Sequence, residues 1–198
     1  MSKVAYKRSK LSPLLSNLGW LLVGISLLIT SPLARAKLEP SVRYQQTNYQ
    51  LCAQQRVTKA LFFDVVDVGV YYPNCQHAEN IFDSQPKLLR FSYLREVEGI
   101  QFTEGADDFL KDNLTDTEKE ACLGAFKDFN TIYKDVADGD YYDLFVTPDQ
   151  GINLQLNQSQ LAELNQAECA VPYLNIWFGS ESMDDDFSEL QDKLKSLN

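Results

Sequence analysis

Apolar and polar residues alternate along several stretches of the chain, a pattern typical of strands with one buried face. In residues 89–93 three apolar side chains alternate with Arg90 and Ser92. Residues 142–146 and 152–156 alternate in the same way on either side of a Pro-Asp-Gln-Gly turn, which predicts a β-hairpin. These patterns indicate antiparallel strands.

Two further strands are predicted earlier in the chain, at residues 49–53 and 60–72, where Val, Phe and Tyr are abundant. The preceding residues, 38–47, are polar and are expected to form an irregular lead-in. Asp64 and Asp67 interrupt the long strand three residues apart, so regular alternation places their side chains on opposite faces. They are therefore not expected to act together as an acid and a base.

Helical periodicity follows the strands. Residues 102–114 predict a short amphipathic helix, and Thr115 with Glu118 forms a capping box for the next one. A third helix is predicted at 168–178 and a C-terminal helix at 187–197. Strands first, helices inserted, a hairpin and then helices again predict an α+β fold, an antiparallel sheet with helices packed on one face.

The first 36 residues have the order of a signal peptide. A basic segment without acidic residues precedes an apolar run at 18–29, and Ala34-Arg35-Ala36 follows as a small-residue cleavage site. We therefore expect a leader at 1–36 and one domain at 37–198, with no stable membrane span after the leader is removed. Retention of the leader as an anchor is the alternative.

Removal of the leader makes the chain more acidic. The leader contains five of the eighteen lysines and arginines and no acidic residue, so its loss changes the formal net charge from -10 to -15. Such a charge repels nucleic acid and anionic membrane surfaces. The leader predicts a periplasmic or secreted location.

The chain has an even number of cysteines, which in an oxidising compartment favours disulfides. Three connectivities are open for the four residues, Cys52, Cys75, Cys122 and Cys169. No CxxC spacing occurs and the single histidine is His77, so a metal site is not expected. His77 lies in a polar segment, where a solvated side chain is the ordinary interpretation, and no glycine-rich phosphate loop is present.

Two arginines flank a tyrosine near the end of the strand at 89–93. Arg90 and Arg95 beside Tyr93 could bind a carboxylate through charge-assisted hydrogen bonds. Two strand arginines more commonly face solvent, and Glu96 and Glu98 are available as surface partners. The sequence favours the second interpretation.

Four blocks of the sequence resemble signature segments of the chalcone isomerase-like proteins of bacterial envelopes, in order and in spacing. They are residues 61–71 (LFFDVVDVGVY), 94–99 (LREVEG), 129–140 and 174–179 (LNIWFG). The resemblance implies the chalcone isomerase fold, an open-faced β-sandwich of an antiparallel sheet backed by helices. It also implies a cleft between the two layers that holds a flat aromatic or a fatty acyl ligand in relatives.

The resemblance does not extend to the enzymes' reactive residues. A threonine, a tyrosine, an asparagine and a second threonine of the plant isomerases match Val66, Phe102, Phe109 and Ile176. None of these side chains can donate a hydrogen bond. Polarising a ketone and stabilising an enolate need such donors, so no catalytic residue is assigned and chalcone isomerisation is not expected.

The resulting hypothesis is a non-catalytic, exported protein that binds a small apolar ligand, such as a fatty acid, between sheet and helices, without a cofactor. The candidate ligand-binding residues are Arg56, Val66, Tyr93, Arg95, Phe102, Phe109, Ile176 and Trp177. Arg56 is the nearest match to the arginine of the family cleft, and Thr58 is the alternative at that place. An envelope interaction module with a filled cleft and a protein partner is the second hypothesis, and an isomerase-type or other enzyme is the third.

Overall fold

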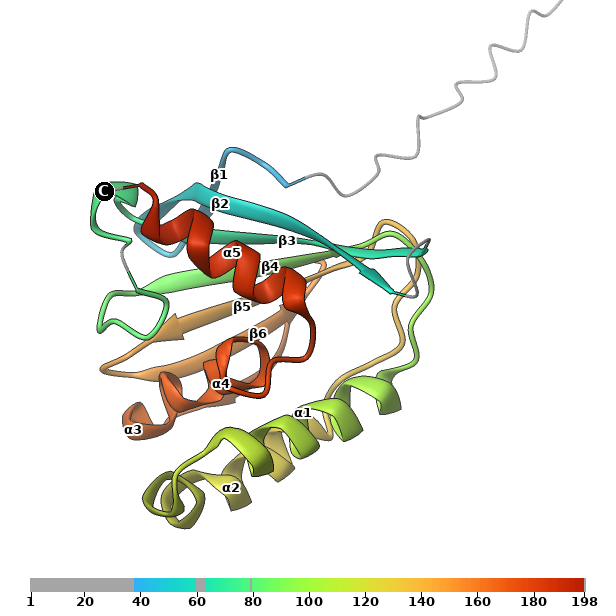
Figure 1. Cartoon of the computed structure of the whole chain (residues 1–198), viewed down its shortest axis with the longest axis vertical. Helices are drawn as coiled ribbons and strands as arrows, with labels where there is room; N and C mark the ends of the chain where they lie inside the picture. The colour runs from blue at the N-terminus through green and yellow to red at the C-terminus, as the bar shows by residue number, and fades with distance from the viewer. Residues whose placement is uncertain (1–37, 60–62, 79, 198) are drawn as a thin grey trace, which may run out of the picture. The chain divides into compact units, whose positions relative to one another are not determined.

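The alternating segments lie in one antiparallel sheet of seven strands in chain order, each hydrogen-bonded to the next (Figure 1). The computed structural model describes residues 38–59, 63–78 and 80–197, so the expected leader at 1–36 lies outside the described residues. The strands are β1 Ser41–Tyr44, β2 Thr47–Lys59, β3 Phe63–Tyr72, β4 Lys87–Tyr93, β5 Tyr141–Thr147, β6 Gly151–Leu156 and β7 Ser159–Leu164. The fold is α+β, a curled half-barrel sheet with helices on one face, as predicted.

The helices divide into an antiparallel pair and a C-terminal group. The pair is α1 (Gly99–Asn113) and α2 (Asp116–Asn130), and α2 begins with the predicted capping box between Thr115 and Glu118. The C-terminal group consists of α3 (Ala167–Ala170), η2 (Pro172–Leu174), α4 (Asn175–Phe178) and α5 (Asp185–Lys195). Of these, α5 packs along β2.

Two sequence-based expectations about elements were wrong. The helix expected at 168–178 is broken into α3, η2 and α4, because Pro172 has no amide hydrogen and cannot continue a helix begun before it. The chain between β6 and α3 also forms an additional strand, β7, after a tight turn in which Asn157 and Gln158 adopt positive φ. The β7 sequence, Ser-Gln-Leu-Ala-Glu-Leu, does not alternate regularly between polar and apolar residues, so the pattern did not predict this strand.

The main core lies between the sheet and the helices, and a second, smaller core lies on the opposite face. The second core consists of Tyr49, Tyr71, Leu88 and Phe145, with side chains of β1 packed against it. The segment expected to be an irregular lead-in therefore contains a strand that helps to cover this opposite face.

Arg90 does not face solvent, contrary to the expectation. Arg90 donates two hydrogen bonds to Asp143 on β5, from Nε at 2.6 Å and Nη2 at 2.7 Å, and both side chains are buried. The guanidinium also lies 4.3 Å from the ring centre of Tyr141. A bidentate pair of this kind compensates for the burial of both charges.

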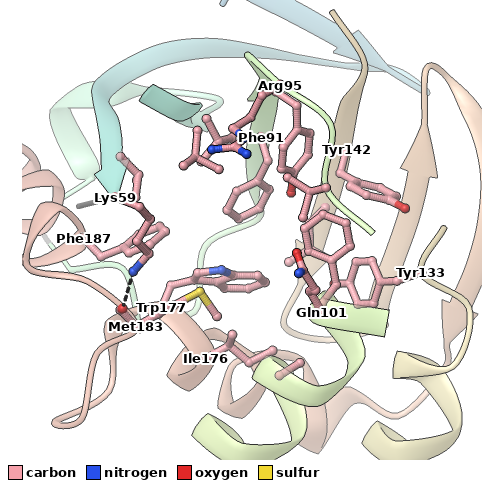
Figure 2. Close-up of a pocket in the computed structure, with 18 of the residues that line it drawn as sticks. Lys59, Phe91, Arg95, Gln101, Tyr133, Tyr142, Ile176, Trp177, Met183 and Phe187 are labelled. Atoms are coloured by element: carbon pink, nitrogen blue, oxygen red, sulfur yellow. Dashed lines mark hydrogen bonds between the residues drawn. The ribbon is translucent and has the colours of Figure 1, made fainter. Parts of the chain in front are cut away.

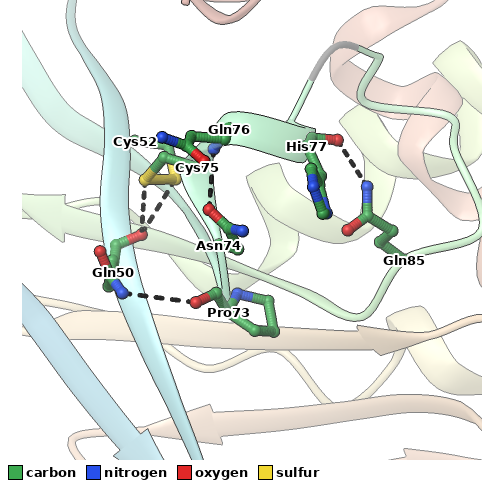
Figure 3. Close-up of a disulfide and its surroundings, with 8 residues drawn as sticks. All are labelled: Gln50, Cys52, Pro73, Asn74, Cys75, Gln76, His77 and Gln85. Atoms are coloured by element: carbon green, nitrogen blue, oxygen red, sulfur yellow. Dashed lines mark hydrogen bonds between the residues drawn. A yellow bond between two sulfur atoms is a disulfide. The ribbon is translucent and has the colours of Figure 1, made fainter.

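The four cysteines form two disulfides, Cys52–Cys75 and Cys122–Cys169, which settles the pairing that the sequence left open. The first joins β2 to the short helix η1 (Cys75–His77) at the surface (Figure 3). The second is buried and joins α2 to α3. Each disulfide thus fixes a segment outside the sheet to its neighbour.

Candidate functional site

A cavity of about 390 Å³ lies between the sheet and the helices (Figure 2). Its size is in the range of small-molecule sites. Twenty of the described residues line it: Val57, Lys59, Val65, Val66, Phe91, Tyr93, Arg95, Glu96, Val97, Gln101, Phe102, Ala106, Tyr133, Tyr142, Leu144, Leu154, Ile176, Trp177, Met183 and Phe187. Most of these side chains are apolar or aromatic, so the lining suits an apolar ligand.

The alternation of the strands and the periodicity of the helices bring these side chains together. Phe91 and Tyr93 project from β4 toward the helices, while Phe102 and Ala106 lie one turn apart on α1. The Trp177 ring of α4 packs 4.8 Å from that of Phe91, centre to centre, and joins the strand wall to the helix wall. Aromatic rings from both layers therefore shape the cavity.

Two of the three tyrosines that line the cavity use their hydroxyls elsewhere. The Tyr142 hydroxyl donates to the Lys134 carbonyl oxygen at 2.9 Å and accepts from the Lys134 amide at 2.8 Å. The Tyr133 hydroxyl lies 3.0 Å from that of Tyr173, which donates to Asn130 at 2.7 Å. These hydroxyls are satisfied by protein groups, so their contribution to the cavity is the aromatic ring.

The charged and amide side chains of the lining are the exposed ones, Lys59, Arg95, Glu96 and Gln101. They mark the solvent-facing side of the cavity. Lys59 donates to Asp184 at 2.7 Å and to the Met183 carbonyl oxygen at 3.2 Å (Figure 2). This interaction ties the end of β2 to the segment that carries Met183 into the lining.

Six of the eight residues predicted to bind a ligand lie together in the lining. They are Val66, Tyr93, Arg95, Phe102, Ile176 and Trp177. Phe109 of α1 is half-buried and does not line the described cavity. Arg56 is half-exposed and does not line it either, and the alternative at that place, Thr58, is also outside the lining.

Arg56 instead bridges two carboxylates. Its Nη1 donates to Asp64 at 2.8 Å and its Nε to Asp67 at 2.7 Å. The expectation that Asp64 and Asp67 face opposite sides was wrong, because a bulge at Val65 shifts the register by one residue between them. The extra residue turns both carboxylates toward Arg56.

Sequence reasoning missed several lining residues, among them Tyr133, Tyr142, Met183 and Phe187. Tyr142 belongs to the predicted hairpin, and its alternation with Asp143 marked it as inward-facing. Met183 lies in an irregular segment without periodicity, so no pattern in the sequence could have placed it in the cavity.

The comparisons with known proteins address the family directly. The profile of the chalcone isomerase-like family matches residues 31–194. The chain belongs to this family.

Among solved structures, one similar to this chalcone isomerase-like protein is a fatty-acid binding protein from Arabidopsis thaliana. The match has a TM-score of 0.57 and 15% sequence identity, and it covers 81% of this chain and 93% of the plant protein. At this identity the likeness shows the shared fold. No curated protein sequence matches the chain.

Val66, Phe102 and Ile176, three of the four apolar residues that the sequence resemblance matches to reactive residues of the plant isomerases, line the cavity. Within residues 38–59, 63–78 and 80–197, no cluster of three or more His, Cys, Asp or Glu side chains is arranged to hold a metal ion. No helix in this same part of the chain is long and apolar enough to span a membrane. The arrangement can hold an apolar molecule by contact and by a few polar groups.

Proposed function

We propose that this chalcone isomerase-like protein is a non-catalytic binder of a small apolar ligand, such as a fatty acid, held between sheet and helices. The observation that carries the proposal is the cavity of about 390 Å³ with its largely apolar and aromatic lining. Transfer of apolar surface from water into such a site contributes roughly 25 cal/mol per Å² buried. A ligand chain that fills the cavity would therefore bind mainly through the hydrophobic effect.

The absence of reactive groups at the matched positions supports binding over catalysis. Val66, Phe102 and Ile176 offer no proton donor or acceptor to a bound molecule. An interaction module with a filled cleft is less well supported, because the side chains between the layers leave a cavity of ligand size. The plant fatty-acid binding protein of the same fold adds to the support for an acyl ligand.

The proposed place of action is outside the cytoplasm. The two disulfides fit an oxidising compartment, and the buried Cys122–Cys169 pair belongs to the core. We propose that the leader at 1–36 directs export and is removed after Ala36. N-terminal sequencing of the protein purified from the envelope fraction would begin at Lys37, whereas a start at Met1 would contradict the removal.

Blocking the cavity tests the binding function. The fluorescent fatty acid cis-parinaric acid is titrated into the delipidated protein, residues 37–198. Ala106→Phe places a ring in the lining, and we expect it to weaken binding at least 10-fold because the ligand and the ring compete for one volume. Ala121→Phe is the matched control, since Ala121 is exposed on α2, and it should bind like the wild type.

Thermal unfolding of both variants would show that they are folded. Equal binding by Ala106→Phe and the wild type would contradict the proposal, as would failure of the wild-type protein to bind the probe. Capture of an envelope protein by a domain that binds no probe would favour the interaction module instead.

A further inference from the structure

Tyr93 differs from every other tyrosine of the cavity wall. Its side chain is 6% exposed, and its ring is held edge-on against Phe102 and Tyr142, with centroid distances of 5.4 and 6.0 Å. Within the described part of the chain, no group donates to or accepts from its hydroxyl. Among the described residues, the Tyr71 hydroxyl is the one side-chain group that is both fully buried and without a hydrogen bond. The Tyr93 oxygen is therefore not fully enclosed by neighbouring atoms.

The surroundings of the Tyr93 hydroxyl keep it protonated, so that it can act as a hydrogen-bond donor. Burial raises the pKa of Tyr93 well above its usual value, and the nearby Tyr133 and Tyr142 hydroxyls act in the same direction. The side chain therefore stays protonated at all physiological pH values and retains one O–H donor. A donor facing a largely apolar cavity gains most from a ligand that brings an acceptor.

We propose that the ligand of this cavity carries a carbonyl oxygen, of a carboxylic acid, ester or ketone, that accepts a hydrogen bond from the Tyr93 hydroxyl. This inference rests on the proposed binding function and adds the chemical class of the ligand. The rest of the ligand is apolar, because Phe91, Phe102 and Trp177 form the surrounding wall. Tyr93 thereby becomes a specificity-determining residue.

Comparison with the neighbouring tyrosines shows why we assign the ligand contact to Tyr93. Tyr133 and Tyr142 line the same cavity, but their hydroxyls are bonded to Tyr173 and to the Lys134 backbone. A ligand that used either hydroxyl would have to compete with an existing protein bond. The Tyr93 hydroxyl is available without such a loss.

Three probes of one chain length test the inference: dodecanoic acid, 2-dodecanone and dodecane. Each displaces cis-parinaric acid from residues 37–198 of the wild type and of Tyr93→Phe, which removes the hydroxyl alone. We expect Tyr93→Phe to weaken the acid and the ketone about 10-fold and dodecane less than twofold, as for the loss of one hydrogen bond.

Tyr133→Phe is the matched control, because it removes a hydroxyl from the same wall that is bonded to protein. It should lower the melting temperature and change the affinity for the three probes by the same factor. Tyr93→Phe should leave the melting temperature unchanged or raise it, since its hydroxyl has no protein partner to lose. A fall in melting temperature with Tyr93→Phe would point to a structural role and overturn the inference.

The outcomes separate this inference from the proposed function. If the relative affinities for the three probes are the same in Tyr93→Phe as in the wild type, the proposed carbonyl contact is wrong while apolar binding stands. If the wild-type protein binds none of the three, both the function and this inference are overturned.

Discussion

The Tyr44 ring of β1 stacks on the Phe145 ring of β5 with centroids 3.8 Å apart and planes 17° apart, although three strands lie between β1 and β5 in the sheet. Neighbouring strands are about 4.8 Å apart, so a flat sheet would separate the two by roughly 19 Å. The β1–β2 hairpin must therefore fold back over the sheet face opposite to the helices. Tyr49 meets Phe145 from the same hairpin.

Removing this stack should release the hairpin from the sheet. Tyr44→Ala is expected to lower the free energy of unfolding by about 2 kcal/mol, from lost apolar burial and from the ring pair. Urea denaturation of residues 37–198 would measure the change. Arg43→Ala is the control, because Arg43 is exposed on the same strand and its loss should cost less than about 0.5 kcal/mol. Equal effects of the two variants would show that the stack does not hold the hairpin.

The buried Arg90–Asp143 pair gives a second prediction. Asp143→Asn leaves the buried guanidinium without a counter-charge, so it should lower the free energy of unfolding by about 3–5 kcal/mol. The double variant Arg90→Met with Asp143→Leu removes both charges and should be markedly more stable than Asp143→Asn. Chemical denaturation of the three proteins provides the test, and a double variant less stable than the single one would contradict it.

The sequence predicted the elements whose residues alternate against a single core. Tyr142 and Leu144 of β5 and Ile152 and Leu154 of β6 are examples, because every second side chain meets the helices. The burial of Arg90 could not be predicted. Its partner Asp143 is 53 residues away, and the ring over its guanidinium, Tyr141, comes from the same distant strand.

The candidate site also contains residues that the sequence could predict and residues that it could not. Val66, Phe102 and Ile176 were found through matched family blocks, and Tyr93 through its place beside Arg95. Arg56 was the nearest match to the arginine of the family cleft, but its neighbour Val57 is the residue that lines the cavity, and the alternation of β2 directs Arg56 away from it. The pairing of Arg56 with both Asp64 and Asp67 depends on the bulge at Val65. Local pattern does not reveal a bulge, since the extra residue is itself an ordinary β-former.

The two disulfides should differ both in accessibility and in their contribution to stability. Cys122 and Cys169 are 1% and 0% exposed, whereas Cys52 and Cys75 are part-exposed. Mild reduction without denaturant, followed by alkylation and mass spectrometry, should therefore open Cys52–Cys75 first. Opening of the buried pair at the same rate would contradict this order.

Replacing each disulfide by two alanines tests the contribution to stability. The closed segments span 23 and 47 residues in sequence separation. Chain entropy alone then predicts losses of about 3 kcal/mol for Cys52–Cys75 and about 4 kcal/mol for Cys122–Cys169. Thermal and urea unfolding would measure both. A larger loss for the surface pair would mean that native packing, and not the length of the closed segment, sets the order.

The Lys59–Asp184 ion pair gives a prediction with a defined pH dependence. Burial raises the pKa of Asp184, but the hydrogen bond and charge of Lys59 and the Asp186 backbone amide outweigh it, so the pKa lies below 3.8. A carboxyl group with a lowered pKa in the folded state contributes stability above the unfolded pKa of about 4. This contribution is lost as the pH falls through the folded value.

Asp184→Asn isolates the contribution, because asparagine also serves as an N-cap and can keep the hydrogen bond to the Asp186 amide. The pair is part-exposed, so we expect a loss of less than about 1 kcal/mol at pH 7. The difference from the wild type should shrink as the pH falls through the lowered pKa of Asp184, and also in 1 M NaCl, where the ion pair is screened. Urea denaturation at several pH values measures it. Lys195→Gln, which breaks the exposed pair with Asp192 on the same helix, should show little change at any pH. A difference between Asp184→Asn and wild type that changes neither with falling pH nor with added salt would show that the ion pair to Lys59 is not what Asp184 contributes.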